Sequence, residues 1–411
     1  MTASPSPWIH RFAVLTALAT LVLVGIGGLV TSHGVGMAVP DWPNTYGYNM
    51  FFFPISQWVG GVFYEHSHRL FASGVGLLTT ILALWLYGKN SRLLLRWGGL
   101  VLATLGLATG FLAPRHRADG IVLGIAGLSA LLAALVWPRC EPSPKWLRRL
   151  GFLAFIGVVL QGILGGLRVV LFKDQIGIFH ATIAQLFFAL MCSLAVFTSP
   201  RWQNRNRNSE VQWPKHAHGL APLFLVTTLL ILGQLVLGAT MRHQHAGLAI
   251  PDFPLAYGKL WPAIDPGSVA KYNQQRIEVL ATNPITGVQI TLQMIHRLLA
   301  VFILFGVGLC AASALKRLGA SNPVTRLTLL WLALVLVQVL LGAATIWSHK
   351  AADIATLHVL TGALLLAVGG ILTIVAYDQK RAAPIYSAAP QAEVPPLNTF
   401  GAVPSSAAHV D

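Results

Sequence analysis

The sequence predicts an all-α polytopic membrane protein made of two tandem four-helix-bundle repeats, with a two-helix insertion in the first repeat. Three observations predict this fold class. Hydrophobic residues make up 55% of the 411 residues and charged residues only 10%, whereas a soluble domain carries about 25% charged residues. Apolar runs long enough to cross about 30 Å of hydrocarbon recur along the chain. Short motifs of the first half return in the same order in the second half.

Each apolar run of 18 or more residues is predicted to be a helix, because lipid offers no hydrogen-bond partner to an unpaired backbone group. The first run is longer than the roughly 7–15 apolar residues of a signal peptide, so we expect it to be retained. The ten predicted crossings lie at about 9–30, 68–87, 93–113, 121–138, 151–172, 179–198, 219–241, 291–313, 327–347 and 355–376.

Four matches in the same order indicate an internal duplication. VPDWPNTYG at 39–47 returns as IPDFPLAYG at 250–258, an offset of 211 shared by Gly27 and Gly238. HRLFA at 68–72 returns as HRLLA at 296–300, an offset of 228. QGILGG at 161–166 returns as QVLLGA at 338–343, an offset of 177, and His180 returns as His358, an offset of 178.

The changing offset locates the insertions. The rise from 211 to 228 gives the second repeat an outer loop that is 17 residues longer, and the fall from 228 to 177 gives the first repeat 51 extra residues. We therefore expect a first repeat over 1–200, with inserted helices at about 91–139. A linker over 201–218 and a second repeat over 219–377 follow. The tail 378–411 is rich in Pro, Ala and Ser and is predicted to be disordered.

The net charge of +15 is explained by basic loops and gives no reason to expect a nucleic-acid partner. With the N-terminus inside, the inner segments hold 17 of the 28 Lys and Arg residues and the outer segments 9. The positive-inside rule then places both termini in the cytoplasm, and we expect an integral protein of a bacterial inner membrane. The three cysteines, Cys140, Cys192 and Cys310, fit neither an outer disulfide nor a metal motif.

The repeated histidines are the strongest candidates for a functional site. His68, His180, His296 and His358 each stand near the outer start of a helix that runs inwards, so the two in each repeat lie at a similar depth. Ionisable groups inside membrane spans are functional candidates, and a planar haem needs two imidazoles that reach one iron from opposite sides. The alternative is an interfacial or hydrogen-bonded role for each ring. Zinc is disfavoured because no third ligand recurs with the histidines.

Neighbouring polar residues suggest further roles. Arg69 and Arg297 follow the first histidine of each pair and are expected either to bind a haem propionate or to extend towards the lipid headgroups. His66 projects from a different helix face than His68, and we expect it to support the site or to meet solvent. No role is assigned to His33, His243 or His245.

The two repeats differ one helical turn before the first histidine. Glu65 precedes His68 by three residues, whereas Gln293 stands at the same place before His296. A carboxylate beside a metal centre can take or give protons, and an amide cannot. The difference predicts one reactive site and one electron-carrying site, with an interfacial acid as the alternative for Glu65.

Over residues 8–376 the sequence resembles the haem A synthase family. The resemblance lies in Glu65-His68-Arg69, Gln293-His296-Arg297, the PDWP and PDFP loops, the QGxLGG helix, and His180 with His358. It implies an oxidoreductase that converts the ring-D methyl group (C8) of haem O to a formyl group by successive hydroxylation, which yields haem A for terminal oxidases. It also implies that His68 and His180 address the substrate haem, that His296 and His358 ligate the iron of a haem b cofactor, and that Glu65 is the essential acid.

The resemblance also has consequences for partners. It implies contact with the lipid bilayer, haem O synthase, oxidase assembly factors and an electron-transfer protein. Two features depart from the family: paired outer-loop cysteines are absent, and the 51-residue insertion adds two crossings to the common eight. Two other classes remain open. A bis-histidine cytochrome b would explain the histidines but not the difference between Glu65 and Gln293, and a transporter would place its polar site near the midplane.

Overall fold

The structure, a computed structural model, describes residues 7–204, 217–275 and 284–381. Within these ranges the chain is helical and forms no strand, only two isolated β-bridges. The ten long helices are α1 (Pro7–Ser32), α2 (Gly60–Tyr87), α3 (Ser91–Leu112), α4 (Arg117–Val136), α5 (Lys145–Leu171), α6 (Asp174–Thr198), α8 (Ala221–His243), α10 (Gly287–Leu318), α11 (Pro323–Trp347) and α12 (Ala352–Arg381). Two short helices, α7 (Pro200–Asn204) and α9 (Pro266–Gln274), lie in connections.

The described ranges contain nine segments that are long and apolar enough to cross a membrane. One of them, Gly60–Leu112, is 53 residues long and contains both α2 and α3. The chain turns back between these helices at Gly88–Asn90, so this segment supplies two of the ten predicted crossings. The predicted all-α polytopic membrane fold is confirmed.

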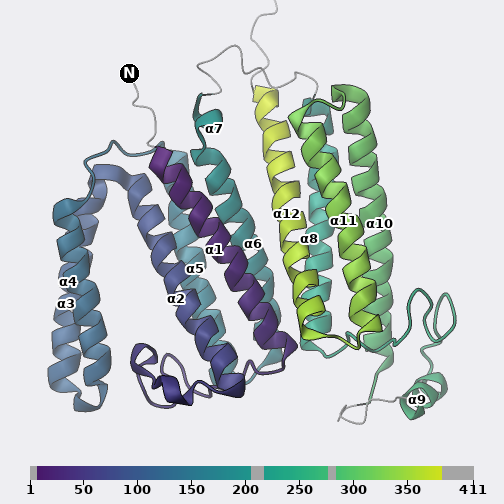
Figure 1. The fold of residues 1–411 in the computed structure, drawn as a ribbon, viewed down its shortest axis with the longest axis horizontal. Helices are drawn as coiled ribbons and strands as arrows, with labels where there is room; N and C mark the ends of the chain where they lie inside the picture. The colour runs from purple at the N-terminus through teal and green to yellow at the C-terminus, as the bar shows by residue number, and fades with distance from the viewer. Residues whose placement is uncertain (1–6, 205–216, 276–283, 382–411) are drawn as a thin grey trace, which may run out of the picture.

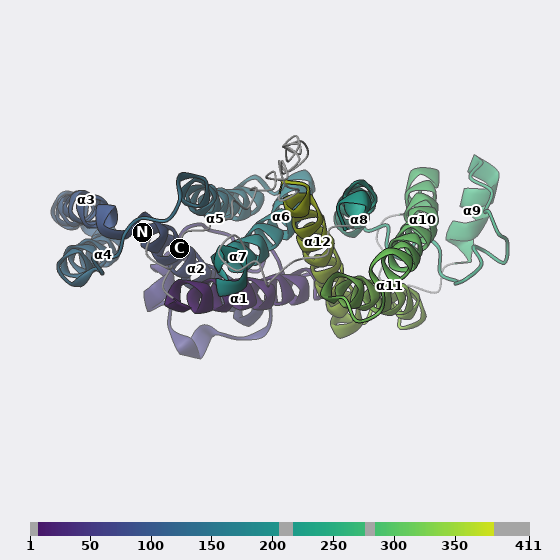
Figure 2. The same cartoon turned by 90° about the horizontal axis from the view of Figure 1, so that it is seen from above.

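The long helices form two bundles side by side (Figure 1). Helices α1, α2, α5 and α6 make the first, and α8, α10, α11 and α12 make the second, with α1 and α6 against α12 where the two meet (Figure 2). Leu82, Met191 and Leu194 are in the core of the first bundle. Phe224, Trp331 and Leu372 are in the core of the second. Apolar burial therefore holds each bundle together, and a smaller cluster of Phe188, Ala363 and Ala367 joins them.

The inserted helices α3 and α4 form a hairpin that stands beside the first bundle (Figure 1). Glycines let their backbones touch: a Cβ on Gly106 would lie 2.5 Å from the amide nitrogen of Gly124, and one on Gly99 would lie 2.8 Å from the carbonyl oxygen of Gly127. Small residues at such contacts are typical of helix pairs in membranes. Asn49 donates a 2.8 Å hydrogen bond to Asp119 and so ties the first outer loop to the hairpin.

The outer loops contain the repeated proline motifs and fold alike. In the first loop the Asp41 carboxylate accepts hydrogen bonds from the backbone of Tyr46 and Gly47, at 2.8 and 2.7 Å. In the second, Asp252 accepts them from Tyr257 and Gly258, at 2.7 and 2.9 Å. The Asp, Tyr and Gly that the two motifs share thus build the same compact turn twice.

Some expected boundaries differ from the structure. Helix α9 occupies part of the longer second outer loop, and α12 continues to Arg381, so residues 378–381 are helical rather than part of the tail. A helix persists to Arg381 because the segment after the last crossing lacks a Pro or Gly until Pro384. Helix α7 begins the expected linker. The rest of the linker, 205–216, and the tail 382–411 lie outside the described residues.

The fold places the start of α1 and the end of α12 on the side opposite the two proline-containing loops (Figure 1). Together with the excess of basic residues in the inner segments, this predicts that both ends face the cytoplasm. Reporter fusions after residue 381 and within residues 48–55 should report opposite compartments. The same compartment for both fusions would contradict this topology.

Candidate functional site

The four repeated histidines lie within the first ten residues of four helices, on the side of the outer loops. Each is half-buried and packs against a glycine of a neighbouring helix. The distance from the histidine Cε1 to the position that a glycine Cβ would take is 3.0 Å for His68 and Gly27, 3.4 Å for His180 and Gly165, 3.4 Å for His296 and Gly238, and 3.2 Å for His358 and Gly342.

These glycines obey the same duplication as the histidines. Gly27 and Gly238 are 211 residues apart, and Gly165 and Gly342 are 177 apart. A larger side chain at any of the four would meet the imidazole, so the glycine fixes how closely the ring can approach the next helix. Sequence reasoning used Gly27 and Gly238 only as markers of the repeat and missed their contact with the rings, although their shared offset was a usable signal.

Each of the four rings presents a buried nitrogen without a partner. The Nδ1 atoms of His68, His180, His296 and His358 are buried and form no hydrogen bond with any described residue, although most buried polar atoms in proteins are paired. In His358 the other ring nitrogen, Nε2, lies 3.4 Å from the side-chain Nε2 of Gln338. A metal-binding histidine commonly has one ring nitrogen held by a neighbouring group and the other left for the metal.

The structure brings together the two histidines of each predicted pair. His68 is close enough to His180 for an electrostatic interaction, and so is His296 to His358. Among residues whose placement is described, no group of three or more His, Cys, Asp or Glu side chains could hold a metal ion. Two imidazoles without a third protein ligand suit an iron whose other ligands come from a porphyrin, and they do not suit zinc.

Glu65 and Gln293 perform matching structural roles at the base of the outer loops. Both are buried, with exposed fractions of 4% and 2%. The Glu65 Oε2 accepts a 2.9 Å hydrogen bond from the backbone nitrogen of Val39, and the Gln293 Oε1 accepts one of 2.7 Å from Ile250. Val39 and Ile250 are themselves repeat equivalents. The difference is that Glu65 also forms a 2.7 Å ion pair with Arg69, which an amide cannot form.

Arg69 and Arg297 both hold the outer loops. The Arg69 guanidinium donates hydrogen bonds to the carbonyls of Asp41, Asn44 and Val39, at 2.7, 3.0 and 3.0 Å. Arg297 donates to the carbonyls of Leu255 and Asp252, at 2.9 and 2.8 Å. The Nη donors of both arginines therefore anchor a loop, a role that the sequence did not indicate.

His66 lies beneath the first outer loop and is fully buried. Its Nδ1 is 3.1 Å from the Thr45 hydroxyl, and the rings of Phe53 and Trp58 pack against it, at centroid distances of 5.0 and 4.7 Å. The expectation that it meets solvent is wrong, because the loop folds over it. His66 therefore supports the first outer loop from below, next to Glu65.

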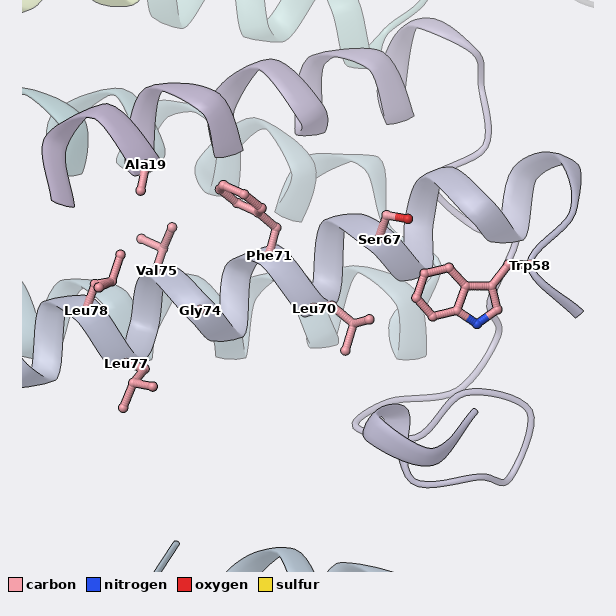
Figure 3. A pocket seen from close by; sticks show the side chains of 9 residues that line it. All are labelled: Ala19, Trp58, Ser67, Leu70, Phe71, Gly74, Val75, Leu77 and Leu78. Atoms are coloured by element: carbon pink, nitrogen blue, oxygen red, sulfur yellow. The ribbon is translucent and has the colours of Figure 1, made fainter. Parts of the chain in front are cut away.

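A cavity of about 570 Å³ runs along α2 (Figure 3). Trp58 marks one end, and Phe71 and Leu78 lie along it, with Ser67 contributing its polar edge. None of the four histidines lines this cavity. Its apolar lining suits a hydrocarbon chain.

Comparison with known proteins identifies the family. A family model described as cytochrome oxidase assembly protein (COX15-CtaA) matches residues 115–369, more than half of the chain. A haem A synthase from Beijerinckia indica is 31% identical over 240 residues, which cover 56% of this chain and 61% of that relative. The chain belongs to the haem A synthase family.

Other relatives extend the comparison. A haem A synthase from Shewanella oneidensis is 23% identical over 369 residues, covering 87% of this chain and 93% of that relative. A component of an ion-translocating oxidoreductase complex from Pseudomonas paraeruginosa is 41% identical over 83 residues, which cover only 20% of this chain and 24% of that relative. The family match at 115–369 contains His180, His296 and His358, whereas Glu65 and His68 precede it.

The glycine contacts generate a prediction with a control on the same helix. Gly238→Leu places a branched side chain against His296, whereas Gly233 on α8 has open space around it. Haem content per chain and the low-spin absorption spectrum should fall to less than half of wild type in Gly238→Leu and stay near wild type in Gly233→Leu. An equal effect of the two substitutions would show that the ring contact does not shape the site.

Proposed function

We propose that the protein is a haem A synthase, an oxidoreductase that converts the ring-D methyl group (C8) of haem O to a formyl group by successive hydroxylation, for the haem A of terminal oxidases. One observation carries the proposal: two pairs of half-buried histidines pack against repeated glycines with their Nδ1 atoms buried, and a carboxylate stands beside only one pair. Family membership supports the same activity.

The two repeats take different roles in this proposal. His296 and His358, from α10 and α12, hold the iron of a haem b cofactor. His68 and His180, from α2 and α6, address the iron of the haem O substrate. Bound haem supplies electron transfer and oxidative chemistry at iron, while the protein positions the rings through Gly27, Gly165, Gly238 and Gly342.

Glu65 is proposed to take up and return protons one helical turn from His68. Arg69 and the backbone of Val39 hold its two carboxylate oxygens, so the group is fixed in place. In the second repeat the amide of Gln293 retains the loop contact and has no exchangeable carboxyl proton. The first repeat is therefore the reactive half and the second the electron-carrying half.

The remaining assignments follow from this activity. The protein is placed in a bacterial cytoplasmic membrane with both termini in the cytoplasm, where haem O synthase supplies its substrate. Oxidase assembly factors and an electron-transfer protein complete its proposed partners.

A bis-histidine cytochrome b is the second candidate, and one observation favours it. One carboxylate oxygen of Glu65 holds the outer loop through Val39, as the amide oxygen of Gln293 holds the second loop through Ile250, and the other oxygen binds Arg69, which anchors the same loop. If that contact is its whole role, the protein carries electrons and transforms no haem. Substitution of Glu65 separates the two candidates.

The haem b assignment predicts the effect of removing either ligand. His296→Ala or His358→Ala leaves one imidazole for the iron, so the low-spin spectrum should disappear and haem b content should fall at least about tenfold, because a lost metal ligand removes a large share of the binding energy. His245→Ala, at an exposed position in the outer loop, is the matched control. Full haem b in the ligand variants would exclude this assignment.

Glu65→Gln tests the reactive half. Gln293 shows that an amide can accept the same loop hydrogen bond, and Arg297 shows that the neighbouring guanidinium can hold its loop beside an amide. The variant should therefore fold and keep haem b. In cells that supply haem O, haem A should fall below about 1% of wild type, in line with general acid–base contributions of 10²–10⁴-fold.

The measurement is pigment extraction and chromatography from membranes of wild type and variant. Haem O or a partly oxidised haem should accumulate in Glu65→Gln. A normal yield of haem A would show that Glu65 only anchors the loop and would leave the cytochrome as the better account.

A further inference from the structure

Arg242 is a largely buried cation at the boundary between the two bundles. It lies in the last turn of α8, four residues after Gly238, whose contact with His296 shapes the second histidine pair. Its Nη2 donates 2.6 Å hydrogen bonds to the carbonyl of Gly28 and to the hydroxyl of Ser32, both on α1 of the other bundle. Its Nε is buried and has no hydrogen-bond partner.

Among the side chains that the structure describes, none neutralises the charge of Arg242. The groups that it contacts through Nη2 are neutral, and Arg242 is in none of the ion pairs formed within the described part of the chain. The charges that act on it include a second guanidinium, that of Arg168, and its own charge acts on the imidazole of His358. A buried charge without a counter-charge is unfavourable, so this geometry favours an anionic ligand beside Arg242.

Comparison of the two repeats indicates that Arg242 serves the second histidine pair and is not part of the helix framework that both repeats share. The position equivalent to Arg242 in the first repeat, at the offset of 211, is Thr31. The Thr31 hydroxyl donates to the carbonyl of Gly27 within its own helix, at 3.0 Å. The other arginine near the second pair, Arg297, uses its Nη donors on the outer loop. Arg242 is therefore a cation that the second repeat has in addition to its loop anchor.

We propose that Arg242 binds a propionate carboxylate of the haem held between His296 and His358. The inference rests on the proposed function and deepens it by naming the group that recognises the acidic edge of the cofactor. Propionates are the anionic groups of a haem, and a guanidinium forms strong charge-assisted hydrogen bonds with a carboxylate. The buried Nε–H supplies a donor that no protein group uses. The same side chain then links the cofactor to α1, next to the glycine that packs on His68.

The test compares protohaem IX with its dimethyl ester, in which both carboxylates are blocked. Each is titrated into the full-length protein, prepared without haem in detergent, and binding is followed by the low-spin absorption spectrum. Wild type should prefer the free acid. In Arg242→Gln this preference should fall about tenfold or more, the change expected for a lost hydrogen bond between charged groups. Arg242→Lys, which keeps the charge, should retain part of the preference.

Ser32→Ala is the matched control, because it removes one contact between α8 and α1 without changing the charge. It should leave the preference for the free acid at the wild-type value. An unchanged preference in Arg242→Gln, or equal weakening of both haems, would overturn the inference and make Arg242 a contact between the bundles only. Wild type that binds both haems without preference would also overturn it, whereas wild type that binds neither would overturn the proposed function itself.

Discussion

The contact between an imidazole ring and a glycine on the neighbouring helix is the constraint on which this structure depends. It occurs four times, at distances of 3.0 to 3.4 Å from the ring to the place of a missing Cβ. The glycine allows the ring to lie between two helices, and helix packing then determines its direction. The buried, unpartnered Nδ1 atoms are the consequence, because no side chain in the described part of the chain bonds to these nitrogens. A buried nitrogen without a partner is unfavourable unless a ligand uses it. The packing therefore leaves the nitrogens available for the proposed haems, and haem binding would offset the cost of leaving them unpaired.

The outer loops turn this repeated scaffold into two different sites. Both loops form the same turn around an aspartate, and both are held by an arginine and by a residue one turn before a histidine. Only that last residue changes its chemistry between the repeats, from carboxylate to amide. The fold is thus maintained while one half gains an ionisable group. Arg242 adds a second difference of the same kind at the boundary between the bundles, where a charge of one half reaches the backbone of the other.

Much of this arrangement could be predicted from the sequence, because it depends on length, hydrophobicity and repetition. The ten helices, the hairpin inserted in the first repeat, the pairing of His68 with His180 and of His296 with His358, and the difference between Glu65 and Gln293 all follow from such patterns. Contacts between segments far apart in the sequence could not be predicted in this way. Arg242 bonds to Gly28, which lies 214 residues away in the sequence, and no local sequence pattern indicates that the two residues meet. The burial of His66 and the use of Arg69 on loop carbonyls depend on how the proline-containing loop folds over α2, which helical periodicity does not determine.

The central claim is that the protein holds two haems of different kinds, one as cofactor and one as substrate. Haem typing of the protein purified from a host that makes haem O tests this most directly. The pigments are extracted from the purified protein, separated by chromatography and quantified per chain. The purified protein should yield haem b together with haem O or haem A. Haem b as the only pigment, at two per chain, would contradict this claim and identify a bis-histidine cytochrome.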